Sequence, residues 1–367
     1  MPEIQEIFEK YGDGYCHSHI ISPEQGKVMR AITSCRTAEL GGHIDVCPAC
    51  VYAKPSYNSC RNRHCPKCQA FAKERWIENQ KFDLLNVQYF HVVFTIPSEL
   101  NTLFFQHDKE MYNLLFRVVA ETLAELSSNK KYLGARIGFT SVLHTWGQNL
   151  CFHPHIHCIV PAGGLTEVRQ WRNSRKKFFL PVKVLSRKFR GKFMAMLKEL
   201  YDNELAQAIV DSCYRKEWVI YCKPPFRDAS CVVEYLGRYT HRVAISNNRL
   251  LSVEDGMVTF KWRDYRDDSK WKVMTLTADE FIRRFLLHVL PKGFMKIRHY
   301  GILGNRDKTK RLNFCKLLTG TEICEKAALT AEELFEKICG HEAGVCPACG
   351  QARTEFYMNL PPPRICS

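Results

Sequence analysis

The chain has 367 residues, which is enough for two or three domains and a substantial core. Its 53 Lys and Arg against 38 Asp and Glu give a formal charge of +15, so we expect a polyanionic partner, of which nucleic acid is the usual one. The sequence has neither a run of about eighteen apolar residues nor the N-terminal pattern of a signal peptide, and we therefore expect an intracellular protein with no membrane partner.

Residues 1–80 are dominated by side chains that bind zinc. The chain has 18 Cys, and in an intracellular protein these are more often metal ligands or buried thiols than disulfides. Cys47–Cys50 and Cys65–Cys68 have the CxxC spacing of zinc knuckles, and together they predict one tetrahedral zinc site. A candidate second, interleaved site consists of Cys35, His43, Cys60 and His64. Alternative ligands for that second site are Cys16, His17 and His19.

Between residues 70 and 146 the apolar spacing predicts two strands separated by helices. We expect a connecting helix over 70–86, a strand over 89–96, one or two helices over 100–126, and a second strand over 139–146. The order strand, helix, hairpin is that of the first part of a ferredoxin-like α+β sheet.

Three histidines alternate along the next predicted strand, residues 152–160. Side chains two residues apart on a strand share a face, so His153, His155 and His157 are expected to point the same way. A hairpin with the preceding strand brings His144 opposite the His155 and His157 pair, which predicts a metal site with three imidazole ligands and open positions. Gln148 and His153 are the competing third ligands.

A basic stretch rich in aromatic residues, 169–193, suits single-stranded nucleic acid. It is followed by a predicted helix over 189–205 and a predicted strand over 218–222.

Two tyrosines one helical turn apart form the second candidate site. Apolar spacing then predicts a helix over 232–242, in which Tyr235 and Tyr239 lie on one face. A phenol is a competent nucleophile toward a phosphodiester when a metal polarises the phosphate and cations hold the strand.

The remaining residues predict a hairpin over 249–262 with an Asp-Gly turn, a helix over 278–290, and a basic stretch over 292–311. The tail holds a third knuckle, Cys346–Cys349, without a clear second half. Its candidate partners are Cys315, Cys339, His341 and Cys366.

Cations near these motifs are expected to neutralise phosphates. Two lie among the predicted zinc ligands, two in the basic stretch that follows the histidines, two beside the tyrosines, and one in the basic stretch over 292–311. They are Arg61, Arg63, Arg175, Lys176, Arg238, Arg242 and Arg298.

Three phrases of the sequence resemble transposases of the insertion sequence ninety-one family, which are HUH endonucleases with two tyrosines. The phrases run from Cys60 to Cys68, from Leu143 to Gln148, and from Tyr235 to Asn247, and the triplet His155-Ile156-His157 accompanies them. They occur in the family's order, and the likeness extends from the N-terminal zinc module to about Arg306.

The resemblance implies a rolling-circle DNA transposase that cleaves and rejoins single-stranded DNA at transposon ends and at the target, through a 5′-phosphotyrosine intermediate. It assigns a divalent ion, Mg or Mn, to His155 and His157, and it assigns the nucleophiles to Tyr235 and Tyr239. The third ligand, His144, comes from the strand geometry alone. A bacterial protein of the cytoplasm, associated with the nucleoid, is implied as well, while the oligomeric state is left open.

The expected organisation is α+β, with a zinc-binding DNA-recognition domain over 1–80 and a ferredoxin-like HUH catalytic domain over 85–245. A basic DNA-contacting region over 246–312 and a tail over 313–367 would follow. A rolling-circle replication initiator or a relaxase would share this chemistry. A zinc-rich protein that binds nucleic acid without catalysis is the alternative outside the enzymes.

Overall fold

The computed structural model describes residues 2–175, 179–201, 204–223, 243–265, 267–324 and 329–363, together with residues 226, 232, 235 and 237. The fold is mixed α/β, and its neighbouring strands pair antiparallel. No helix in this described part is both long and apolar enough to span a bilayer.

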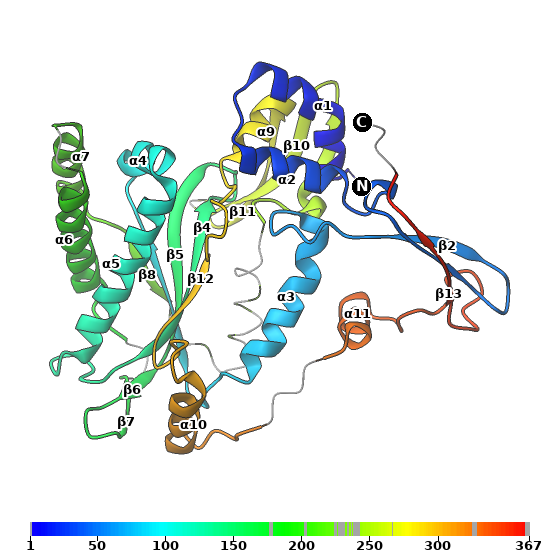
Figure 1. The fold of residues 1–367 in the computed structure, drawn as a ribbon. Coiled ribbons are helices and arrows are strands. Elements are labelled where there is room, and N and C mark those ends of the chain that lie inside the picture. Colours follow the sequence, from blue (N-terminus) through cyan, green and yellow to red (C-terminus); the bar gives the residue numbers. More distant parts are fainter. Residues whose placement is uncertain are drawn as a thin grey trace.

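A five-stranded antiparallel sheet forms the centre of the molecule, with strand order β12-β4-β5-β3-β8 (Figure 1). Its strands are β3 (Tyr89–Thr95), β4 (Gly138–Trp146), β5 (Phe152–Pro161), β8 (Ile220–Lys223) and β12 (Ile297–Gly301). The strands predicted at 89–96, 139–146, 152–160 and 218–222 are confirmed to within two residues at each end. The histidine-bearing strand β5 is the middle one, so both of its edges are paired.

Helices cover one face of this sheet, and the main apolar core lies beneath them (Figure 1). They are α4 (Asn101–Gln106), α5 (Asp108–Ser128), α6 (Val182–Leu200) and α7 (Glu204–Tyr214). Phe94 of β3 packs against Phe189 of α6, with ring centroids 5.0 Å apart. Helix α6 begins at residue 182 rather than 189 because Pro181 precedes its first turn, where a proline does not break a helix.

The opposite face of the sheet carries the histidines and is flanked by α3 (Pro66–Lys81) (Figure 1). Trp76 of α3 packs against a small cluster made by Tyr89, Ile159 and Val232. The helix predicted at 70–86 is thus present but shifted toward the N-terminus. Pro66 stands at its first position, which favours a helix start there.

The N-terminal helices pack against the region that follows the tyrosines. Phe8 of α1 (Ile4–Ser18) lies 5.3 Å from Phe285 of α9 (Ala278–Leu286), measured between ring centroids. The same core contains α2 (Pro23–Thr33) and one face of a second sheet, β9 (Leu250–Glu254), β10 (Met257–Asp264) and β11 (Lys270–Thr277). The predicted hairpin and the predicted helix at 278–290 are therefore confirmed, although the helix ends at 286.

The chain ends meet in a third sheet, with strand order β13-β1-β2. It joins β1 (Gly42–Val46) and β2 (Ala53–Tyr57) to β13 (Glu355–Leu360), and it projects from the body of the molecule (Figure 1). The remaining elements are α10 (Lys308–Leu318), α11 (Ala331–Cys339), the small hairpin β6 (Gly163–Leu165) and β7 (Trp171–Asn173), and three short 3₁₀ turns.

Two of the expected domain boundaries divide units that pack together. Strand β12 lies beyond residue 245 yet forms an edge of the central sheet, paired with β4 from Ile297↔Val142 to Gly301↔Gly138. Helices α1 and α2 share their core with residues 244–286 rather than with the knuckle Cys47–Cys50. Nothing in local composition signals either long-range contact.

Candidate functional site

The β4–β5 hairpin brings three histidines together. In the ladder His144 pairs with His155 and Val142 pairs with His157, so all three imidazoles lie on one face of the sheet. Their candidate ligand atoms lie within 4.8 Å of one another. Ring centroids are 4.5 Å apart for His144 and His157 and 4.8 Å apart for His155 and His157. His144 and His157 are buried.

Contacts made by Nδ1 orient two of the three rings, those of His155 and His157. Nδ1 of His155 lies 2.6 Å from the main-chain oxygen of His153, and Nδ1 of His157 lies 2.8 Å from Nε2 of His91. A metal ion at these two rings would therefore be bound through Nε2. Metal-binding histidines characteristically use their other ring nitrogen in this way, which fixes the tautomer and the ring orientation.

Of the three candidates for the third ligand, His144 is the one that the structure brings to the pair. The amide of Gln148 donates a hydrogen bond of 3.2 Å to the hydroxyl of Tyr265, and His153 is exposed. A donor set of three imidazoles fits a divalent transition ion such as Mn²⁺ better than it fits Mg²⁺, which prefers oxygen ligands.

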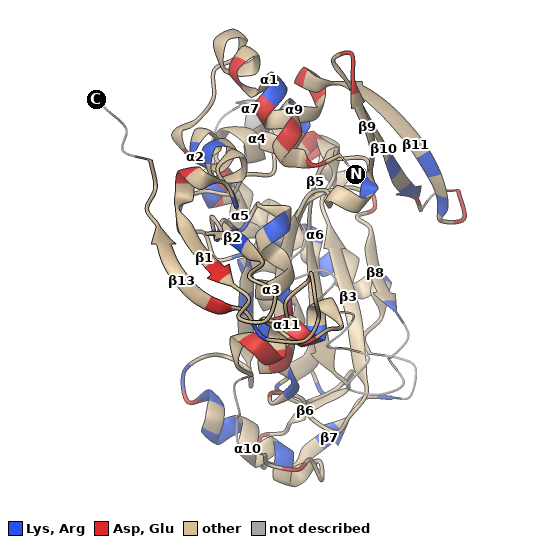
Figure 2. Ribbon diagram, turned by 90° about the vertical axis from the view of Figure 1, so that its right-hand side faces the viewer, with Lys and Arg blue, Asp and Glu red and all other residues tan. Residues whose placement is uncertain are grey.

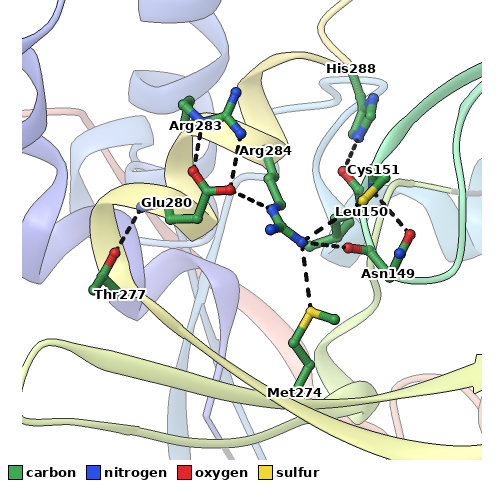
Figure 3. A network of polar contacts seen from close by, with 9 residues as sticks. All are labelled: Asn149, Leu150, Cys151, Met274, Thr277, Glu280, Arg283, Arg284 and His288. Carbon is green, nitrogen blue, oxygen red and sulfur yellow. Dashed lines mark hydrogen bonds and ion pairs between the residues drawn. The ribbon is translucent and has the colours of Figure 1, made fainter. Parts of the chain in front are cut away.

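The turn between β4 and β5 is anchored by the region around α9 (Figure 3). Arg284 donates to the main-chain oxygen of Asn149 at 3.2 Å, and the ring of His288 lies 3.1 Å from the oxygen of Leu150. Nε of Arg284 lies 2.6 Å from Oε1 of Glu280, with which it forms an ion pair. Arg249 donates to the main-chain oxygen of Gln148 in the same turn. These bonds fix the loop that sets the spacing of the histidines.

Tyr235 lies beside the histidine cluster. Its hydroxyl is 3.1 Å from Nδ1 of His91, whose other nitrogen contacts His157. Burial lowers the pKa of His91 to about 3, with a further contribution from the Lys223 ammonium, so this ring is neutral at physiological pH. Nζ of Lys223 lies 5.4 Å from the Tyr235 ring centre. The second predicted nucleophile, Tyr239, lies outside the described residues.

His91 and Lys223 are functional candidates that the sequence did not single out. In the ladders His91 faces Ile159 of β5 and Lys223 of β8, which places both side chains on the histidine face. Their strands were predicted correctly. The strand register, which decides their neighbours, has no local signal in the sequence.

Four cysteines of the N-terminal segment form a compact thiol cluster: Cys35, Cys60, Cys65 and Cys68. Sγ of Cys68 lies 3.6 Å from Sγ of Cys35 and 3.6 Å from Sγ of Cys60. Four thiolates around zinc at about 2.3 Å would have sulfur atoms about 3.8 Å apart. A hydrogen bond from the Cys65 thiol lowers the pKa of Cys68 to about 5, so the cluster favours a thiolate. The spacing fits a structural zinc site.

The predicted pairing of the zinc ligands is wrong. Cys47 and Cys50 do not join Cys65 and Cys68, but meet a different pair of thiols. Neither histidine of the predicted second site joins the first cluster. Nε2 of His43 lies 3.2 Å from a carboxylate oxygen of Asp45, and burial lowers the pKa of His64 to about 3.

The cations predicted to bind nucleic acid divide into exposed residues, residues outside the described part of the chain, and residues that contact other parts of the protein. Arg61 and Arg175 are exposed. Lys176, Arg238 and Arg242 lie outside the described residues. Elsewhere, Lys and Arg recur along α10 and on the β10–β11 ribbon (Figure 2). On the ribbon Lys261, Arg263 and Lys270 are exposed, whereas on α10 Lys310 is exposed and Lys316 is buried.

Arg63 and Arg298, two of the cations predicted to bind DNA, make contacts within the protein. The Arg63 guanidinium donates to three main-chain oxygens of the segment before β12, including that of Phe294 at 2.6 Å. The Arg298 guanidinium lies 4.1 Å from the ring centre of Phe116 and donates to the Asn113 side chain at 2.6 Å. Arg63 thus fastens the segment before β12, and Arg298 fastens β12 to helix α5.

Comparison with known proteins places this geometry in a family. Residues 138–311 match a family model described as "Putative transposase", and residues 7–96 match one described as "Transposase zinc-binding domain". The first span holds the three histidines and Tyr235, and the second holds the four-cysteine cluster. No solved structure matches the chain.

Two curated relatives extend over most of the chain. "Putative transposase y4qJ" of Sinorhizobium fredii is 46% identical over 373 residues, covering 96% of this chain and 94% of the relative. "Transposase for insertion sequence element IS801" of Pseudomonas savastanoi pv. phaseolicola is 28% identical over 319 residues, covering 79% of this chain and 74% of the relative. The chain therefore belongs to the IS91 family of transposases and carries the N-terminal zinc-binding domain of that family.

Proposed function

We propose that this transposase cleaves and rejoins single-stranded DNA through a 5′-phosphotyrosine formed on Tyr235. The observation that carries the proposal is the position of the Tyr235 hydroxyl, one imidazole away from the histidine cluster through His91. A metal ion close by can polarise the scissile phosphate for attack by a tyrosine, and His144, His155 and His157 would supply its ligands.

The arrangement of the sheet supports a ferredoxin-like HUH nuclease fold. Five antiparallel strands carry helices on one face, and the three histidines lie on the other face, with His155 and His157 on the middle strand and His144 on its neighbour. A divalent ion at this site, Mn²⁺ or Mg²⁺, would polarise the scissile phosphate as a Lewis acid. The ligand chemistry favours Mn²⁺.

The protein groups then have defined tasks. The Tyr235 oxygen forms a bond to phosphorus, the bond between phosphorus and the 3′ oxygen breaks, and the 3′ oxygen leaves with a proton as a free hydroxyl. The phosphodiester energy is kept in the phosphotyrosine, so rejoining needs no nucleotide. Lys223, beside the tyrosine ring, is placed to attract the DNA backbone. Tyr239 would act as the second nucleophile, one helical turn from Tyr235 in the sequence.

The proposed substrates are single strands at the transposon ends and at the target, exchanged by rolling-circle transposition on the nucleoid of a bacterial cell. The formal charge of +15 supports a polyanionic partner. The exposed cations Lys261, Arg263 and Lys270 of the β10–β11 ribbon and Lys310 of α10 would extend the contact beyond the site (Figure 2).

A covalent-adduct assay tests the proposal. The full chain is incubated with a labelled single strand that carries the element's end, with Mn²⁺ or Mg²⁺, and the adduct is resolved on a denaturing gel. Wild type should form it and Tyr235→Phe should lose it, while a binding assay shows that DNA is still held. Tyr214→Phe, an exposed tyrosine of α7 on the other side of the sheet, is the matched control. Adduct formation at the wild-type rate by Tyr235→Phe would refute the role of this tyrosine.

A further inference from the structure

Two knuckles at opposite ends of the chain meet in space. Sγ of Cys47 lies 3.7 Å from Sγ of Cys349, and Sγ of Cys50 lies 3.7 Å from Sγ of Cys346. All four sulfur atoms lie within 4.8 Å of one another. The four cysteines, named here the terminal cluster, are separate from the cluster of Cys35 and its partners.

The sulfur spacing fits a tetrahedral metal site rather than disulfides. A disulfide has its sulfur atoms about 2.05 Å apart, whereas four thiolates at about 2.3 Å from a central zinc have them about 3.8 Å apart. Both measured separations, 3.7 Å, agree with the second value. In the described part of the chain all four cysteines are free thiols.

The two knuckles share sequence and backbone geometry, which is an independent indication of a shared purpose. Residues 46–50 and 345–349 both read Val-Cys-Pro-Ala-Cys. The amide of Val51 donates to the Cys47 oxygen at 2.9 Å, and that of Gly350 donates to the Cys346 oxygen at 2.9 Å. Val51 and Gly350 both have positive φ, 58° and 67°. A β-branched residue rarely adopts that conformation, so the structure around Val51 must hold the turn in it.

Strand pairing and helix contacts bring the knuckles together. β13 pairs with β1 from Gly42↔Leu360 to Val46↔Glu355, directly beside the first knuckle. Upstream in the tail, Lys337 of α11 forms an ion pair of 2.6 Å with Glu74 of α3. The tail lies beyond both family matches, which end at residues 96 and 311.

We propose that Cys47, Cys50, Cys346 and Cys349 bind a second zinc ion, which fastens the C-terminal tail to the N-terminal zinc-binding domain. The third knuckle thus has Cys47 and Cys50 as partners, and not the predicted Cys315, Cys339 or His341; Cys366 lies outside the described residues. The proposal does not depend on the nuclease mechanism.

Zinc counting by native mass spectrometry of the full chain is the first test. Wild type should carry one zinc ion more than the double variant Cys346→Ser with Cys349→Ser, whatever the three-histidine site holds. Cys324→Ser with Cys339→Ser, which removes two exposed thiols outside the cluster, is the matched control and should keep the wild-type count. Equal zinc counts in wild type and in the first double variant would overturn the proposal.

A thiol-reactivity measurement on the wild-type protein covers the case in which the variant does not fold. Iodoacetamide labelling followed by peptide mapping should show the four thiols of the terminal cluster reacting about tenfold or more slowly than Cys324 and Cys339. Treatment with a strong chelator should abolish that protection. Equal labelling of all six thiols before chelation would count against the site.

Discussion

The hydroxyl of Tyr235 lies 3.1 Å from Nδ1 of His91. Because Nε2 of the same ring lies 2.8 Å from Nδ1 of His157, one neutral imidazole connects the tyrosine to the histidine cluster. A cation bound at Nε2 of His157 would require the proton of that ring to be on Nδ1, where it is donated to His91. His91 would then carry its own proton on Nδ1 and donate it to the tyrosine oxygen. A hydrogen bond in that direction favours the phenolate, the form that would attack phosphorus in the proposed reaction.

Substitutions at His91 should separate its two contacts. Glutamine can place its terminal oxygen near the position of Nε2, where it accepts the hydrogen bond from His157, so His91→Gln should keep the His157 contact but lower the rate of adduct formation by about 10- to 100-fold. Asparagine places its nitrogen near Nδ1, so His91→Asn should keep the tyrosine contact and instead weaken Mn²⁺ affinity by a similar factor. Single-turnover rates and Mn²⁺ titrations measure the two effects. Wild-type behaviour of both variants would show that His91 only packs.

The histidine cluster should bind Mn²⁺ more tightly than Mg²⁺, because imidazole nitrogens suit the transition ion. Loss of one ligand in His144→Ala should weaken Mn²⁺ binding by about 100-fold or more, whereas His153→Ala, which removes an exposed ring of the same strand, should change it little. Electron paramagnetic resonance of free Mn²⁺ during titration provides the affinities. Equal losses in the two variants would contradict the assignment of His144.

The parts of the site that could be predicted from the sequence are those encoded in local periodicity. Alternation along β5 and a short link to β4 were sufficient to bring His144, His155 and His157 to one face. His91 could not be found in this way, because its neighbours depend on the register of β3 against β5.

The zinc pairing depends on contacts far apart in the sequence. Three CxxC pairs have the same local form, so spacing alone favoured joining the two nearest knuckles. The structure instead joins Cys47 to Cys349, because β1 pairs with β13 at the other end of the chain. A repeat of Val-Cys-Pro-Ala-Cys at 46–50 and 345–349 was the available signal for this pairing.

Glu280 should make stability depend on pH in the acid range. Hydrogen bonds from Arg283, together with those from Arg284, lower the pKa of Glu280 to about 2 from its model-compound value of 4.5 (Figure 3). A carboxyl with a lowered folded-state pKa stabilises the protein above its unfolded pKa, and this contribution is lost as the pH falls from about 5 toward about 2. Since the side chain is 30% exposed, we expect about 1 kcal/mol rather than the larger figure that the shift alone implies.

Urea unfolding of Glu280→Gln measures this contribution. The variant should be less stable than wild type at pH 7. The difference should shrink at pH 3, because the contribution of Glu280 to the free energy of unfolding is smaller there. Glu254→Gln, which removes an exposed carboxylate at the end of β9, is the matched control. A difference for Glu280→Gln that is the same at both pH values would exclude the electrostatic explanation.

Gly237, two residues from Tyr235, should be required for the close approach of its backbone to Ile77 of α3. A Cβ atom at residue 237 would overlap Cδ1 of Ile77, and Ile77 is buried, so the clash has little room to relax. Overpacking of this kind costs about 1 to 3 kcal/mol, and Gly237→Ala should therefore displace the helix segment that bears Tyr235 and slow adduct formation.

Shortening the opposing side chain in Gly237→Ala with Ile77→Ala should restore much of the rate, while Ile77→Ala alone should lower stability by leaving a cavity. The cycle of four proteins, measured for adduct rate and for unfolding, gives the coupling between the two residues. Strictly additive effects would mean that Gly237 acts through its own backbone and not through the contact with Ile77.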